Sequence, residues 1–138
     1  MNTRPPRGHE ELPHTADWAL RAWGEDLPAL FAEAALGMNA LSGVRLQPAP
    51  RITRRLELEA DDDESLLVAF LSELLYVQEA EGLAFDDLRI QTDGPRLSAE
   101  MEGGAVASIA RPIKAVTFHN LKIARMAGGF QAEIVFDV

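Results

Sequence analysis

Two segments with apolar residues at helical spacing restrict most strongly what this chain can fold into. Asp26 can cap the first segment, because an aspartate before a helix satisfies free amide donors, and Gly43 can end it. The acidic run 61–64 can cap the second segment in the same way, and Gly82 follows its end. Both segments therefore predict amphipathic helices. Their apolar positions are Leu27, Leu30, Phe31, Ala34, Met38 and Leu41 in the first, and Leu66, Leu67, Phe70, Leu71, Leu74 and Leu75 in the second.

Alternating apolar and polar residues predict strands in the rest of the chain. Turns are expected at residues 93–95, at Gly103-Gly104 and at residues 127–129. The pattern predicts an α+β fold, in which a mostly antiparallel or mixed sheet packs against two amphipathic helices as a single two-layer domain over residues 12–138. Residues 1–11, rich in proline and arginine, are expected to form a flexible leader. The expected strands are 18–23, 52–60, 85–92, 97–101, 113–123 and 130–137.

Composition excludes several classes of function. The chain has no cysteine, which excludes disulfides and thiolate zinc sites, and it shows no apolar signal segment, so we expect a cytoplasmic protein. No stretch is long and apolar enough to span a bilayer, so no membrane partner is expected. The net charge of -9 opposes a free-standing RNA or DNA binder, which needs a basic footprint to displace counterions. We therefore expect any nucleic acid to be handled through a partner.

Isolated histidines and cations have ordinary structural explanations. The three histidines match no zinc spacing, although His14 could orient Asp17, and His119, expected inside a strand, could support a site in the same way. Three cations near the end of the chain could meet an anion or an acidic partner, but solvated positions on a strand face explain them more simply. These cations are Lys114, Lys122 and Arg125.

Two carboxylates at opposite ends of the sequence form the most informative pair. Asp17 stands at the mouth of the first expected strand, and Asp137 precedes the main-chain carboxylate of Val138. If the two ends meet, like charges ~4 Å apart would repel by roughly 4 kcal/mol at an effective dielectric of about 20. A hard divalent ion prefers oxygen ligands and would turn this repulsion into binding. Residue types alone also allow a small metal-dependent phosphoester hydrolase built on His14, Asp17 and His119.

Several motifs in order along the chain resemble the archease family. The resemblance covers residues 12–138 without large gaps, and motifs that recur in the same order are far more specific than any single one. The matching motifs are HTAD at residues 14–17, LFAEAA at 30–35, ESLL at 64–67, IKAVTFHNL at 113–121 and IVFDV at 134–138.

The resemblance implies a small α+β module without catalytic activity of its own. Archeases assist the GTP-dependent RNA ligase of the RtcB type in tRNA splicing and RNA repair, where they promote guanylylation and multiple turnover. The implied partner is that ligase, and tRNA or broken RNA is implied only through it. By the same resemblance, a divalent cation would bind Asp17, Asp137 and the terminal oxygens of Val138. Ca²⁺ is the expected ion, with Mg²⁺ and Mn²⁺ as alternatives. The implied supporting residues are His14, Thr15, Lys114 and His119.

A second role has been suggested for members of this family, that of a chaperone-like adaptor for a tRNA-modifying methyltransferase. Such a role would depend less on metal. An effect on methyltransferase solubility without an effect on the ligase would favour it.

Overall fold

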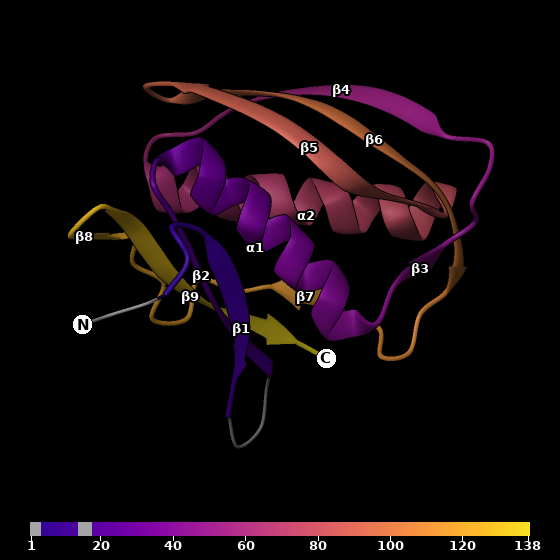
Figure 1. Cartoon of the computed structure of the whole chain (residues 1–138), viewed down its shortest axis with the longest axis horizontal. Coiled ribbons are helices and arrows are strands. Elements are labelled where there is room, and N and C mark those ends of the chain that lie inside the picture. The colour runs from indigo at the N-terminus through magenta and orange to yellow at the C-terminus, as the bar shows by residue number, and fades with distance from the viewer. Residues whose placement is uncertain (1–3, 14–17) are drawn as a thin grey trace.

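The computed structural model describes residues 4–13 and 18–138, along which two helices and nine strands follow one another (Figure 1). In one antiparallel sheet, β6 pairs with β3, β4 and β5. In the other, β2 and β9 pair at the centre, β1 lies outside β2, and β7 and β8 pair with β9. The elements are β1 (Gly8–Leu12), β2 (Trp18–Gly24), α1 (Leu27–Ser42), β3 (Arg45–Leu46), β4 (Ile52–Glu59), α2 (Asp63–Glu81), β5 (Leu83–Asp93), β6 (Arg96–Ser108), β7 (Ala115–Val116), β8 (Ala124–Met126) and β9 (Gly129–Asp137).

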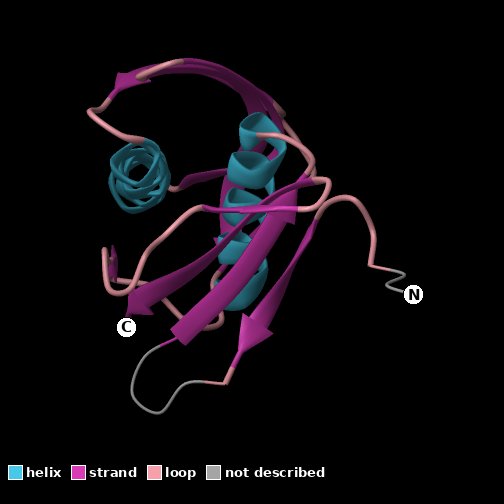
Figure 2. Cartoon of the chain, turned by 90° about the vertical axis from the view of Figure 1, so that its left-hand side faces the viewer, coloured by secondary structure: helices cyan, strands magenta, loops and turns pink. Residues whose placement is uncertain are grey.

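The fold class is confirmed as α+β, with antiparallel sheets and two helices. The strands, however, divide between two sheets, where a single sheet was expected. Figure 1 shows the two helices between these sheets, and Figure 2, turned by 90°, shows α2 end-on beside α1. Apolar residues from both sheets therefore reach one shared core around the helices.

The helix α1 forms where its capping signals predict it. The Asp26 side chain accepts a hydrogen bond from the Ala29 amide at 2.8 Å, and Gly43 ends the helix with a left-handed φ of 68°. The helix contacts β1, β2 and β9 on one side and β5 on the other. Since both sides meet a sheet, α1 is buried nearly all round, more completely than its amphipathic pattern indicates.

The helix α2 also forms where its capping residues predict it. The Asp62 carboxylate accepts a hydrogen bond from the Ser65 amide at 2.7 Å, and Gly82 ends the helix with a φ of 67°. The rings of Phe31 in α1 and Phe70 in α2 stack with centroids 6.2 Å apart, and both side chains are fully buried. This aromatic pair joins the two helices at the centre of the core.

The flexible leader expected over residues 1–11 is wrong for residues 8–11, because β1 pairs with β2 through all five of its residues. Nδ1 of His9 lies 3.0 Å from Oε1 of Glu33 in α1, which fastens the strand to the helix beneath it. Upstream, the indole of Trp23 donates to the carbonyl of Pro5 at 2.9 Å. Most residues of β1 are polar, so its own sequence does not predict a strand. Its contacts with β2 and α1 stabilise it.

The predicted turn at Gly103-Gly104 is also wrong, because β6 runs through both glycines. A β-bulge in β5 between Phe85 and Asp87 brings the neighbouring backbone very close to this point. A Cβ on Gly103 would lie 1.9 Å from the carbonyl oxygen of Ala84. Glycine is therefore required for close approach of two strands and not for a turn.

The strand expected over residues 113–123 is interrupted. In this region only the short strands Ala115–Val116 and Ala124–Met126 pair with β9, one at each end of it. The intervening residues 117–123 leave the ladder as a loop, so His119 does not lie in a strand as expected. The predicted turn at residues 127–129 is confirmed, and Gly128 there has a φ of 83°.

We expect the ion pair between Arg51 and Asp86 to make stability depend on pH in acid. Arg51 Nη2 lies 2.5 Å from Asp86 Oδ1, and this hydrogen bond, opposed by partial burial, lowers the pKa of Asp86 below its usual value. A carboxyl with a lowered folded-state pKa stabilises the fold above its unfolded pKa, and that contribution is lost as the pH falls through the folded pKa. Asp86→Asn should therefore flatten the loss of unfolding free energy between about pH 5 and pH 2, measured by urea titration.

The matched control is Asp93→Asn, which removes an exposed carboxylate without an arginine partner among the described residues. Acid profiles that coincide for wild type and Asp86→Asn would contradict the expectation. The size of the effect should be small, since both side chains are about half exposed and water screens the pair.

Candidate functional site

The candidate site is built at the end of β9, where three strands of one sheet meet. Phe136 of β9 pairs with Trp18 of β2 on one side and with Val116 of β7 on the other. Phe136 itself is fully buried and anchors this end of the strand in the core. The next residue, Asp137, is held in a defined position because the strand that carries it is paired on both sides.

Asp137 faces solvent, as the alternation of β9 predicts. Its carbonyl oxygen accepts a hydrogen bond from the Lys114 amide at 2.8 Å, while Val138 is partly buried against the core. Among the described residues, no hydrogen bond or ion pair engages the Asp137 carboxylate. The side chain is thus free to bind a ligand from solvent, and oxygen ligands of this kind suit a hard cation.

The predicted residues His14, Thr15 and Asp17 lie outside the described residues. The ladder between β2 and β9 begins at Trp18, directly after Asp17, and its partner Phe136 directly precedes Asp137. Within residues 4–13 and 18–138, no group of three or more histidine, aspartate or glutamate side chains could hold a metal ion. The complete ligand set therefore stays a prediction.

The two predicted supporting residues in the described region have different surroundings. Lys114 is exposed, and its amide hydrogen bond places its backbone beside Asp137. His119 is exposed in the loop, and its Nε2 lies 3.3 Å from Nδ2 of Asn120. The structure thus brings Lys114 to Asp137, whereas His119 forms its hydrogen bonds with described residues inside its own loop.

Arg111 lies beside this end of the sheet and was not singled out from the sequence. Its guanidinium carbon lies 4.2 Å from the centroid of the Trp18 ring, and Nη2 donates to the carbonyl of Leu41 at 3.1 Å. The same nitrogen lies 3.5 Å from Oε1 of Glu11. Arg111 therefore covers Trp18 and ties α1 and β1 to the start of β2, a placement that no local pattern around residue 111 predicts.

The loop over residues 117–123, next to the site, is held by specific hydrogen bonds. The hydroxyl of Thr117 donates to the Val135 carbonyl at 3.0 Å and accepts from the His119 amide at 3.2 Å. At the other end, the Ile123 amide donates to the Glu64 carboxylate at 2.8 Å. Glu64 in the first turn of α2 thus also positions this loop, beyond the helix-start role expected for the acidic run.

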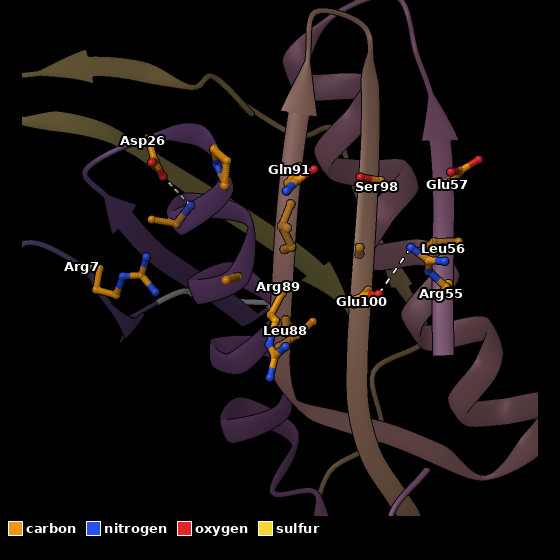
Figure 3. Close-up of a pocket in the computed structure, with 15 residues that line it drawn as sticks. Arg7, Asp26, Arg55, Leu56, Glu57, Leu88, Arg89, Gln91, Ser98 and Glu100 are labelled. Atoms are coloured by element: carbon orange, nitrogen blue, oxygen red, sulfur yellow. Dashed lines mark hydrogen bonds and ion pairs between the residues drawn. The ribbon is translucent and has the colours of Figure 1, made fainter. Parts of the chain in front are cut away.

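A separate cavity of about 930 Å³ lies beside the first turns of α1 and the strands β4, β5 and β6 (Figure 3). Several of its charged groups have partners: Asp26 caps α1, and Arg55 lies 3.4 Å from Glu100. Arg7 at its rim pairs with Glu25 at 3.1 Å. None of the residues lining the cavity belongs to the predicted cation site, so the end of β9 stays the better candidate.

Comparison with known proteins agrees with this architecture over nearly the whole chain. Residues 9–138 match the model of the Archease protein family (MTH1598/TM1083). This chain belongs to the archease family. The archease of Thermococcus gammatolerans is 34% identical, with 96% of this chain and 99% of the relative covered. The archease of Methanosarcina mazei is 33% identical, with 94% and 95% covered.

Two solved structures share the fold of this archease family member. The solution structure of Methanobacterium thermoautotrophicum protein 1598 has a TM-score of 0.70 and 29% identity, covering 95% of this chain and 99% of that one. The crystal structure of an archease from Thermotoga maritima, described as a possible chaperone, has a TM-score of 0.69 and 22% identity, covering 100% and 99%. In the part of this chain that the structure describes, no helix is long and apolar enough to cross a membrane.

Proposed function

We propose that this archease family member is a non-catalytic activator of a GTP-dependent RNA ligase of the RtcB type. In this role it promotes guanylylation and repeated turnover of the ligase in tRNA splicing and RNA repair, and it meets RNA only through the ligase. The observation that carries the proposal is membership of the archease family over residues 9–138. The exposed carboxylate at the paired end of β9 supports it, because it offers an oxygen ligand close to the start of β2 at Trp18.

The proposed cation site uses Asp17, Asp137 and the main-chain oxygens of Val138. The described part of this set fits a hard cation, since the Asp137 carboxylate is exposed and no described residue neutralises it. A bound Ca²⁺, or Mg²⁺ or Mn²⁺ in its place, would supply positive charge for a phosphate group that gains negative charge during nucleotide transfer. The chain's own part is to hold the carboxylates in place, with the Lys114 amide fixing the backbone at Asp137.

The test is single-turnover guanylylation of the cognate ligase with GTP and divalent ion. Wild-type protein should raise the rate, and Asp17→Ala should abolish the increase, because one carboxylate ligand is lost from the proposed site. Asp93→Ala, which removes an exposed carboxylate at the turn between β5 and β6, should stimulate as wild type does. Equal stimulation by wild type and Asp17→Ala would show that the ion site is not the means of activation.

A second candidate role is a chaperone-like adaptor for a tRNA-modifying methyltransferase. The observation in its favour is that the Thermotoga maritima archease, which shares this fold, is described as a possible chaperone. This role predicts that the protein keeps a methyltransferase soluble on heating, equally with and without a chelator. If the protein keeps the methyltransferase soluble but does not stimulate the ligase, the adaptor role is favoured over the ligase role.

A further inference from the structure

The segment from Gly103 to Ala132 has a charge opposite to that of the rest of the chain. It contains no aspartate or glutamate, although the whole chain has 22 acidic residues and a net charge of -9. Both lysines of the protein, Lys114 and Lys122, lie in it. A local positive charge on an acidic protein gives that protein one face that can meet an acidic partner.

Three cations of this segment, Lys114, Lys122 and Arg125, take part in no ion pair among the described residues, and Lys114 lies beside Asp137 at the candidate site. Lys122, in the loop, and Arg125, in β8, are exposed. The guanidinium of Arg125 instead lies 5.5 Å above the ring of Phe130. On other surfaces Arg7, Arg21 and Arg51 pair with carboxylates, whereas Arg45, Arg89 and Arg96 of the other sheet are exposed without an ion pair among the described residues. The positive charge along this edge of the sheet is therefore available to a partner.

An exposed aromatic side chain lies on the same edge. Phe118 is 58% exposed, whereas Leu121 and Ile123 of the same loop pack against the core. The loop that carries Phe118 is held in place, because the Leu121 amide donates to the Phe118 carbonyl at 3.0 Å and both ends of the loop are hydrogen-bonded. An aromatic ring presented to solvent on a preformed turn resembles the anchors of protein interfaces.

We propose that Phe118, Lys122 and Arg125, here called the basic edge, form a docking surface for an acidic protein surface with an apolar pocket. The Phe118 ring enters the pocket, and the two cations meet carboxylates around its rim. The inference rests on the proposed function to the extent that the partner tested is the RNA ligase. The acidic remainder of the chain repels such a partner, so this face alone sets the orientation of docking.

A nucleic acid fits the same surface less well. Phosphate binding gains strength from the number of cations that neutralise it, and the basic edge supplies two. The net charge of -9 repels a long polyanion, whereas a protein can present its carboxylates locally. One anchor with two rim cations is thus better matched to a protein.

The experiment measures binding of the full-length chain to the cognate ligase, without RNA, by titration calorimetry at low and at physiological salt. Phe118→Ala should weaken binding about tenfold or more, as the loss of an interface anchor does. Lys122→Glu should weaken binding at low salt and reduce its dependence on salt. The matched controls Tyr76→Ala and Arg89→Glu alter an exposed aromatic on α2 and an exposed cation on β5, and should bind within about twofold of wild type.

Guanylylation assays with the same variants separate the two proposals. If wild type stimulates the ligase, and if Phe118→Ala and Lys122→Glu bind and stimulate it as well as wild type does, the docking proposal is overturned and the proposed function stands. If wild type neither binds nor stimulates the ligase, both the proposed function and the docking proposal fail. If the variants lose affinity for a fluorescein-labelled single-stranded RNA while ligase binding is unchanged, the surface is a nucleic-acid site and the protein docking proposal is overturned.

Discussion

Phe31→Ala should lower the free energy of unfolding by about 3 to 5 kcal/mol, the largest change in stability that we expect from one substitution. Phe31 is fully buried in α1, between the two sheets, and its ring stacks on Phe70 of α2. Truncation to alanine removes buried apolar surface and leaves a cavity that α1, held from both sides, cannot close. Urea titration followed by circular dichroism measures the change.

Tyr76→Ala is the matched control for this experiment. Tyr76 is an aromatic residue of α2, but it is 63% exposed, so its truncation should alter stability by no more than about 0.5 kcal/mol. A loss below about 1 kcal/mol for Phe31→Ala would show that the core around α1 repacks easily. That outcome would contradict the arrangement in which one shared core joins the two sheets.

Asp137→Asn should weaken binding of Ca²⁺ by about tenfold or more and abolish ligase stimulation, with little change in stability. The asparagine keeps the size of the side chain but removes the negative charge that attracts the ion. Stability should change little, because the side chain is exposed and no described residue contacts it through a hydrogen bond or an ion pair. Titration calorimetry with Ca²⁺ measures the binding, and thermal unfolding measures the stability.

Asp93→Asn serves as the control for Asp137→Asn, since it removes one charge from an exposed position on the other sheet. It should bind Ca²⁺ as wild type does, which excludes a general effect of net charge. Unchanged Ca²⁺ affinity in Asp137→Asn would contradict a ligand role for this carboxylate. Ligase stimulation that persists in the same variant would separate activation from cation binding.

Local rules account for the parts of the fold that the sequence predicts well. The caps Asp26 and Asp62 and the stops Gly43 and Gly82 act on residues three or four positions away, so both helices could be placed from the sequence. The alternation in β4 likewise matches its half-buried structure, because each strand residue faces the side opposite to its neighbour.

The candidate site was only partly accessible to the same rules. The alternation of β9 correctly places Asp137 on the exposed side, since Ile134 and Phe136 must face the core. No local pattern indicates that Lys114 lies beside Asp137, or that Arg111 covers Trp18, because the partners are far apart in the sequence. The sequence predicts a continuous strand over residues 113–123, so it does not indicate that Phe118 is exposed in a loop.

The sequence by itself therefore determined the helices, most of the strands and the family, since periodicity, capping and ordered motifs need only residues near one another in the chain. Only the tertiary structure decided the division into two sheets, the ordering of β1 and the loop that interrupts the last hairpin. These features depend on which distant groups come into contact: Glu33 with His9, and Glu64 with the Ile123 amide. Such contacts stabilise segments whose own composition specifies no structure.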